Sequence, residues 1–292
     1  MFFDPACIPC IIEQAYKAAV YFSEGDKALE LKIVKEVCEE VKVVNENYTA
    51  PQFSIKMQSI IERNLGRTNP FEKQKKANIA KAKKILPLIL EYFEKSTDKL
   101  EAVVRIAIAG NIIDIGANPD FDIVAEIETL GNNNIELTEL PRFRNAAKSA
   151  KLILYIADNY EEALFDKFLL TSLAHCRVVF AVRSYPILND ITLEDAEELG
   201  INKICEVIES GSKIAGTDLS VCNEKFIEIF NEADMVIAKG QGNYETLLNV
   251  NREIYFMFKV KCKGIADRSG LSVGKGALLH KPKFKENNNE KI

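Results

Sequence analysis

The segment "LILYIADNYEEALFDKFLL" (residues 152–170) indicates the fold class of this chain. It opens with an apolar run typical of a buried strand, and after Asp158-Asn159 it takes on the spacing of a helix. A strand that leads directly into a helix is a building unit of α/β proteins. The two polar residues at the junction have two interpretations. They cap the helix, or they belong to a site at the carboxyl end of a strand, where open α/β sheets bind ligands.

The same alternation of strand and helix continues toward the end of the chain. Apolar runs that stop abruptly in polar residues or glycine alternate with helical patterns, in the order 152–157 (strand), 162–174 (helix), 176–184 (strand), 193–201 (helix), 223–233 (helix), 233–243 (strand) and 252–262 (strand). This order predicts a largely parallel sheet flanked by helices, a Rossmann-like α/β fold. Periodicity alone leaves 102–111 open as a helix or a strand.

The first third of the chain has a different pattern, with helical spacing from residue 7 to about 100. Gly66 is a plausible helix C-cap, and an interruption is expected near Pro87. We therefore predict an all-α N-terminal region (1–100) packed on an α/β core (101–280). The polar residues 281–292 form a tail that is expected to be disordered.

Composition narrows the function classes. The 292 residues are 47% hydrophobic and 28% charged, with a formal net charge of −5, which argues against a nucleic-acid partner. No apolar run has the length of a membrane span, and the N-terminus lacks the pattern of a secretory signal. Seven cysteines, an odd number, indicate reduced thiols. We expect a cytoplasmic protein, and the oligomeric state is open.

The spacing Cys7-Ile-Pro-Cys10 is that of redox motifs, but no strand precedes it as in a thioredoxin-like unit. It supplies two of the four ligands that zinc takes, and Cys262 is one further candidate. The alternative interpretation is packing on a helix face.

Polar residues follow three of the predicted strands. They are Asp158-Asn159, Asn189-Asp190, and Lys239 with Gly240 and Gly242. Because parallel strands end at one edge of a sheet, these residues are expected to converge. Asp and Asn oxygens suit Mg²⁺ or Mn²⁺, and a lysine beside glycine N–H groups suits an anion. Each stretch alone also fits a helix cap or a turn, so it is their coincidence that favours phosphoryl chemistry.

Together these stretches resemble the damage-control phosphatase family, long catalogued as domain of unknown function 89, and most of all its CxxC-bearing prokaryotic and archaeal branch. The matching motifs are "CIPCIIEQAYKAA", "TNPFEKQKKAN", "AIAGNIIDIGAN", "YIADNYEEALFDKFLL", "RSYPILNDIT", "GTDL", "ADMVIAKGQGNYETL" and "FKVKC". The resemblance implies a metal-dependent phosphatase acting on phosphomonoesters of small metabolites, such as sugar phosphates or damaged cofactor-related compounds.

The resemblance also implies roles for individual residues. Asp158, Asn159 and Asp190 match the family's metal ligands for Mn²⁺, Mg²⁺, Co²⁺ or Ni²⁺, and Asp158 and Lys239 are the expected catalytic residues. The residues expected to contact the substrate or its phosphate are Asn111, Asp114, Glu162, Gly240, Gln241, Gly242, Asn243, Tyr244 and Lys259, with Lys261 as a competing alignment for the last.

One position departs from the family pattern, because Glu161 stands where the family has glycine. Glu161 is expected to crowd the pocket or to add negative charge near the phosphate, which would change substrate choice more than metal binding. One alternative is therefore a non-catalytic protein that binds metal and a phosphometabolite, and a second, independent of Glu161, is a Rossmann-type nucleotide-binding enzyme. The second lacks the G-x-G-x-x-G fingerprint after its early strands.

Overall fold

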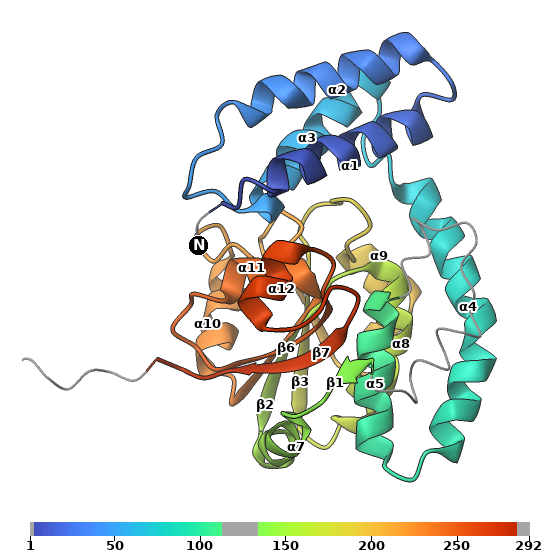
Figure 1. The fold of residues 1–292 in the computed structure, drawn as a ribbon. Helices are drawn as coiled ribbons and strands as arrows, with labels where there is room; N and C mark the ends of the chain where they lie inside the picture. Colours follow the sequence, from blue (N-terminus) through green and yellow to red (C-terminus); the bar gives the residue numbers. More distant parts are fainter. Residues whose placement is uncertain (1–2, 113–133, 285–292) are drawn as a thin grey trace, which may run out of the picture.

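The computed structural model describes residues 3–112 and 134–284, and its centre is a seven-stranded sheet (Figure 1). The strands are β1 (Ile135–Glu136), β2 (Leu152–Ile156), β3 (Arg177–Val182), β4 (Glu206–Glu209), β5 (Met235–Lys239), β6 (Ile254–Lys259) and β7 (Gly276–Lys281), in the spatial order β1-β7-β6-β5-β2-β3-β4. All neighbouring pairs are parallel except β6–β7. The predicted parallel α/β sheet is confirmed.

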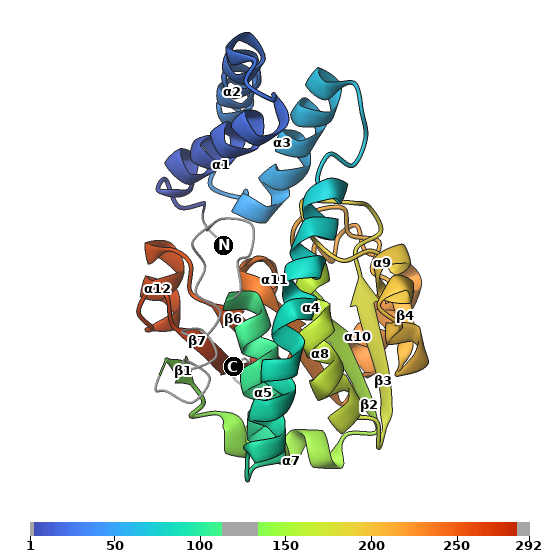
Figure 2. The same ribbon diagram turned by 90° about the vertical axis from the view of Figure 1, so that its right-hand side faces the viewer.

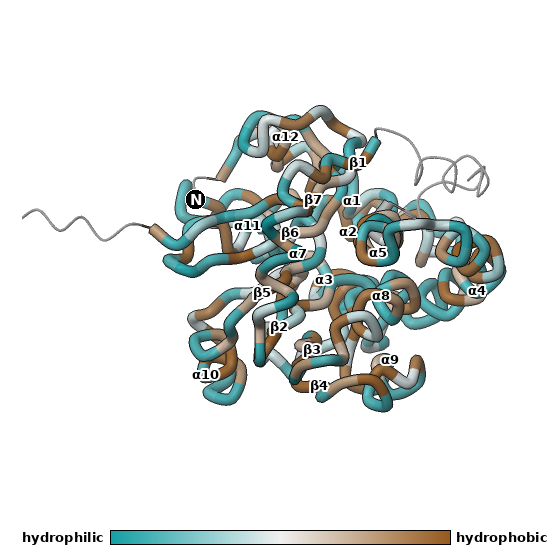
Figure 3. Tube along the Cα trace, turned by 90° about the horizontal axis from the view of Figure 1, so that it is seen from below, coloured by the Kyte–Doolittle hydropathy of each residue, from teal (hydrophilic) through white to brown (hydrophobic). Residues whose placement is uncertain are grey.

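Helices cover both faces of the sheet. Successive residues of a strand point to opposite faces, and because these strands are apolar at successive positions, both faces must be buried. Tyr155, Phe180 and Ile237 lie in one apolar cluster, with residues from α4 (Glu72–Lys95), α5 (Lys99–Ile112), α7 (Leu140–Ser149), α8 (Tyr160–Ser172) and α9 (Leu193–Glu198). Their strand neighbours Ile156, Ala181 and Ala238 face α10 (Glu224–Glu232), α11 (Gly240–Leu247) and α12 (Lys263–Ser269). Figure 3 shows the two helical layers on opposite sides of the strands.

The N-terminal helices form a separate block beside the sheet (Figure 2). Helices α1 (Cys7–Phe22), α2 (Lys27–Val41) and α3 (Ala50–Leu65) share their own apolar core. Helix α4 then runs from this block along α8 and α5. The predicted all-α region is therefore present, and α3 ends at Gly66 in the left-handed conformation, as expected.

The structure resolves or corrects several details of the sequence analysis. Residues 102–111 lie in α5, so this run is a helix. Helix α4 continues through Pro87 instead of breaking there, because Ile85 and Ile89 on either side are both buried in the core. Strands β1, β4 and β7 were not predicted, and β7 includes Lys281, one residue beyond the expected core. Residues 285–292 of the expected tail lie outside the described residues.

The order of the strands indicates where in the sheet a ligand would bind. The chain builds β2, β3 and β4 in one direction across the sheet and then returns to place β5 on the other side of β2. This reversal is a topological switch point, where the loops after two adjacent strands diverge and leave a crevice. Asp158 follows β2, and Gly240 follows β5 directly. No helix within the described ranges 3–112 and 134–284 has the length and apolar character that a membrane span requires.

Candidate active site

The loops after β2 and β3 are joined by backbone hydrogen bonds. The N–H of Ile191 donates to the carbonyl of Asp158 (2.9 Å), and that of Tyr160 donates to the carbonyl of Asn189 (2.9 Å). Between these bonds, Asn159 and Asp190 form an isolated β-bridge. The two polar pairs singled out from the sequence are therefore adjacent in space.

These side chains do not cap helices. Asn159 occupies the N-cap position of α8, yet its side chain accepts no hydrogen bond from the first turn. Its Nδ2 instead faces Asp158 Oδ2 (3.2 Å) and Glu162 Oε2 (3.4 Å). Helix α9 is capped by Thr192, which forms a capping box with Asp195. The capping interpretation is therefore wrong for both pairs.

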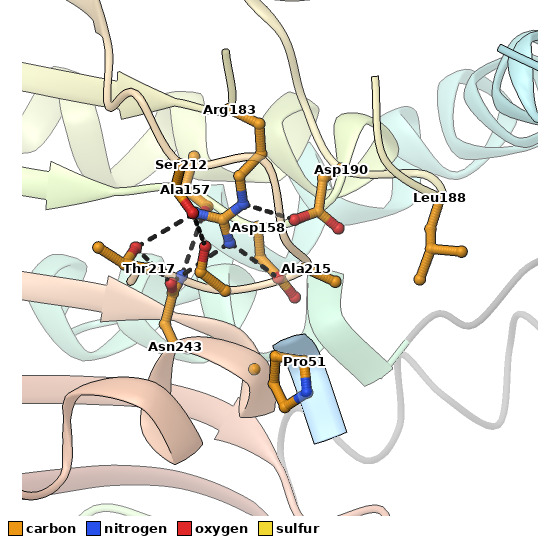
Figure 4. Close-up of polar contacts among 12 residues, drawn as sticks. Pro51, Ala157, Asp158, Arg183, Leu188, Asp190, Ser212, Ala215, Thr217 and Asn243 are labelled. Atoms are coloured by element: carbon orange, nitrogen blue, oxygen red, sulfur yellow. Dashed lines mark hydrogen bonds and ion pairs between the residues drawn. The ribbon is translucent and has the colours of Figure 1, made fainter. Parts of the chain in front are cut away.

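Arg183 lies at the centre of the site (Figure 4). Its side chain is 1% exposed, and its Nε donates to Asp190 Oδ2 at 2.7 Å. One terminal nitrogen lies 3.9 Å from Asp158 Oδ1, and the guanidinium also donates to Thr217 and Asn243 (both 3.3 Å). The guanidinium thus joins the loops after β2 and β3 to helix α11.

The electrostatics of the site are dominated by carboxylates that face one another. Burial, followed by the negative charges of Asp190 and Glu162, raises the pKa of Asp158 to about 8, although Arg183 and Lys261 oppose this shift. Burial likewise raises the pKa of Asp190, against the opposing charge of Arg183. The charges of Arg183 and Lys261 do not outweigh burial and the neighbouring carboxylates, so an additional cation would stabilise the ionised form of Asp158.

The start of helix α11 completes the site from the side of β5. Gly240 has φ +79°, and a Cβ at this position would overlap the carboxylate of Asp158. Glycine is required here for both reasons. A Cβ on Gly242 would overlap the carbonyl oxygen of Ala215. The N-cap residue Lys239 gives no side-chain cap, which leaves the first N–H groups of the helix available to an anion.

Lys239 itself points away from this edge. Its ammonium is fully buried and contacts Glu162, Asp166 Oδ1 (2.6 Å) and the carbonyl of Ala107 (2.9 Å). Burial alone would lower the pKa of Lys239, but the carboxylates of Asp166 and Glu162 outweigh burial and raise it. The structure therefore places both Lys239 and Glu162 in an ion-pair cluster beneath the site.

The remaining predicted residues occupy varied positions. Asn243 is buried and donates to the carbonyls of Lys239 (2.7 Å) and Ala157 (3.1 Å). Gln241 Oε1 accepts from the backbone N–H of Lys261 (2.9 Å). Tyr244 packs against aromatic rings of β6, as part of the core.

Two lysines were competing alignments for a substrate contact. Lys259 is half-buried at the end of β6, whereas Lys261 is exposed and its charge acts on Asp158. Asn111 and Asp114, in the stretch "GNIID", were also predicted to contact the substrate. Asn111 lies in the last turn of α5, and its side chain is not described. Asp114 lies outside the described residues.

The sequence analysis missed Arg183 and Thr217. Arg183 directly follows the apolar run 178–182, so a cation at a predicted strand end was the available signal. Thr217 Oγ1 donates to Asn243 Oδ1 (2.8 Å), and nothing in its local sequence indicates this contact.

The donor set fits a hard divalent cation. Within residues 3–112 and 134–284, no three His, Cys, Asp or Glu side chains are grouped as a metal site. Asp158, Asn159 and Asp190 instead offer two carboxylates and one amide. The mutual repulsion of the carboxylates and the oxygen character of all three side chains suit Mg²⁺ or Mn²⁺ better than zinc.

The Cys7-x-x-Cys10 pair lies apart from these ligands, in the first turn of α1. Burial, followed by the charges of Glu245 and Asp4, raises the pKa of Cys7 to about 11. The thiol form therefore predominates at neutral pH, which disfavours a nucleophilic role. Cys7 packs against the core of the N-terminal block.

Comparison with known proteins decides the family. The sequence model of the family described as the damage-control phosphatase ARMT1-like domain matches residues 3–277 of this chain. The chain belongs to the damage-control phosphatase family. A damage-control phosphatase of Pyrococcus horikoshii is 36% identical over 74% of this chain and 75% of its own. An uncharacterised protein of Methanocaldococcus jannaschii is 35% identical over 94% of each chain.

The structural comparison agrees with this family. A crystal structure of a protein of the DUF89 family from P. horikoshii superimposes with a TM-score of 0.83 and 29% identity, covering 96% of this chain and 99% of that one. The resemblance found in the sequence is thereby confirmed. Membership of the damage-control phosphatases supports a phosphatase as the reaction class.

Proposed function

We propose that this damage-control phosphatase is a metal-dependent enzyme that hydrolyses phosphomonoesters of small metabolites. The observation that supports this most is the pair of facing carboxylates, half-buried Asp158 and buried Asp190, beside the uncapped start of helix α11. A divalent cation and a phosphate placed there would each find the opposite charge that it needs.

Asp158, Asn159 and Asp190 would hold the cation. When bound, the cation supplies Lewis acidity and neutralises charge on the phosphoryl oxygens. Arg183 keeps Asp190 oriented toward the site through its Nε hydrogen bond (2.7 Å). Gly240 lets the Asp158 carboxylate lie against the backbone of α11.

The first N–H groups of α11 would bind the phosphate oxygens, because a helix N-terminus attracts anions. Lys261 is the exposed lysine whose charge reaches Asp158, so we assign the phosphate contact to Lys261 in preference to Lys259. We assign Lys239 a charge-balancing role beneath the site, because its ammonium is already surrounded by Glu162 and Asp166.

Two routes to hydrolysis fit this arrangement. In one, water attacks the phosphorus directly. In the other, the Asp158 carboxylate attacks first, the P–O bond to the leaving alcohol breaks, and water then releases phosphate from the acyl phosphate. Acid quenching of a single turnover with a ³²P-labelled substrate separates the two routes, because only the second leaves label on the protein.

The test of the function is hydrolysis of p-nitrophenyl phosphate by metal-stripped protein, with Mg²⁺, Mn²⁺, Co²⁺ or Ni²⁺ added back singly. We expect turnover that requires metal and that Asp158→Asn abolishes without loss of the fold. Absence of turnover with every metal, in folded protein that still binds Mn²⁺ and phosphate, would instead identify a binding protein. A panel of sugar phosphates and cofactor-related phosphates then defines the substrate.

A further inference from the structure

One face of helix α4 carries two polar side chains that are buried against the active-site loops. Lys75 and Asn78 are 4% and 3% exposed and lie one helical turn apart. The Lys75 ammonium donates to the backbone carbonyl of Asp190 (3.0 Å) and pairs with the carboxylate of Asp195 at the start of α9. A residue of the N-terminal region thus touches the backbone of a proposed metal ligand.

Asn78 reaches the same loop through Glu161. The Oε1 of Glu161 accepts from Asn78 Nδ2 (3.2 Å) and from Asn189 Nδ2 (2.9 Å). Glu161 is 4% exposed, so its carboxylate is enclosed between α4 and the loop that precedes Asp190. The expectation that Glu161 crowds the pocket or brings charge to the phosphate does not match this position.

The loop that these contacts hold, residues 186–190, includes a residue in an unfavourable backbone conformation. Leu188 has φ +48°, a left-handed conformation that costs free energy in a residue with a side chain. Helix α3 also braces this loop, because Gln58 accepts from the N–H of Leu188 (2.7 Å) and donates to the carbonyl of Pro186 (2.5 Å). Helices α3 and α4 together fix a segment that has no regular structure of its own.

We propose that helix α4 is a clamp on the metal site: Lys75, and the chain of contacts Asn78–Glu161–Asn189, hold Asp190 and Asn159 in the arrangement that binds the divalent cation. This inference rests on the proposed function. Lys75 and Glu161 are positioning residues, because neither is placed to touch substrate or metal. Glu161, at the position where the resemblance leads us to expect glycine, forms a contact between the helical region and the core.

The first test compares Mn²⁺ binding, measured by calorimetry, in Lys75→Met and Lys76→Met. Lys76 is the next residue on α4 and pairs with exposed Glu72, so it is a matched control. Loss of partners that orient metal ligands typically weakens metal binding about 10- to 100-fold. We expect that loss in Lys75→Met and a change of less than about twofold in Lys76→Met. Equal affinities in the two variants would overturn the proposal.

The second test uses three substitutions of Glu161. Gln keeps the carbonyl oxygen that accepts both amides, so Glu161→Gln should bind Mn²⁺ nearly as wild type does. Glu161→Ala and Glu161→Gly should weaken binding about tenfold or more and speed amide hydrogen exchange in residues 187–191. A Glu161→Gly protein with higher turnover and unchanged Mn²⁺ affinity would show that Glu161 obstructs the pocket, which contradicts the clamp.

The two hypotheses fail in different ways. If wild-type protein does not bind Mn²⁺, the proposed metal site is wrong and the clamp falls with it. If wild-type protein binds Mn²⁺ and all Glu161 and Lys75 variants bind it equally, the clamp alone is wrong. The hydrogen-exchange measurement requires no catalytic activity, so it reports on the loop even in an inactive variant.

Discussion

The carboxylate of Asp158 lies directly against the Cα of Gly240, so that a single methyl group on Gly240 would overlap it. The two residues are 82 positions apart in sequence and meet because β2 and β5 are adjacent parallel strands that end at one edge. Their contact joins the proposed metal ligand to the proposed phosphate-binding helix.

Gly240→Ala is therefore expected to damage the site more than the fold. The added methyl displaces the Asp158 carboxylate, and we expect metal-dependent turnover to fall about 100-fold or more, in line with the cost of misplacing a catalytic group by about 1 Å. An alanine held in the left-handed conformation of Gly240 also destabilises the fold by about 1–3 kcal/mol. Turnover of p-nitrophenyl phosphate and urea unfolding measure the two effects.

Gly270→Ala is the matched control for this variant. Gly270 has φ +72° at the end of α12, and a Cβ there would meet nothing within 4 Å. An alanine at position 270 therefore reproduces the backbone strain of Gly240→Ala without any overlap with the Asp158 carboxylate. Activity that falls equally in both variants would show that strain, and not displacement of Asp158, causes the loss.

Arg183→Met is predicted to destabilise the protein strongly. The substitution leaves the Asp190 carboxylate buried without its ion-pair partner, which typically costs about 3–5 kcal/mol. Arg177→Met, at the start of the strand that ends just before Arg183, removes a largely exposed pair with Glu206 and should cost about 1 kcal/mol or less. Urea unfolding of both variants gives the comparison, and similar losses would contradict a central role for Arg183.

The sequence allowed the approach of Asp158 and Asp190 to be predicted because it depends on a general property of parallel sheets. Apolar runs that stop at polar residues mark the strand ends, and parallel strands bring those ends to one edge. The family motifs then supplied the chemistry. Nothing beyond local pattern and chain topology was required for this part of the prediction.

The direction of individual side chains could not be predicted in the same way. Lys239 beside two glycines indicates an anion site, yet its ammonium turns inward because Glu162 and Asp166, one turn apart on α8, face it across the core. Glu161 points to α4 because Asn78 and Asn189 offer two donors. These partners are distant in sequence.

Strand β4 also escaped prediction, because half of its four residues are charged and the strand lies at the sheet edge.

Asp234 provides a test of stability against pH at the other end of the sheet. Its Oδ2 accepts from the backbone N–H groups of Leu152 (2.9 Å) and Lys151 (2.8 Å), and these bonds lower the pKa of Asp234. A lowered pKa means that the stabilisation is present above the unfolded pKa of about 3.9 and is lost as pH falls through the folded pKa. Asp234→Ala should lower Tm at pH 7, and the gap to wild type should close toward pH 3. A gap that stays constant would assign the effect to packing.

Asp158→Asn should reverse its effect on stability when a metal is added. Without metal, burial and the facing carboxylate of Asp190 make an ionised Asp158 unfavourable, and the neutral amide avoids this cost, so the variant should melt at the same temperature or higher in chelator. With Mn²⁺ at 100 times its Kd, wild type gains about 2.7 kcal/mol by mass action, which corresponds to a rise in Tm of several degrees. The variant has lost a ligand and should gain little. Thermal melts of both proteins with chelator and with Mn²⁺ should therefore cross over, and a Tm rise of equal size in the variant would remove Asp158 from the metal site.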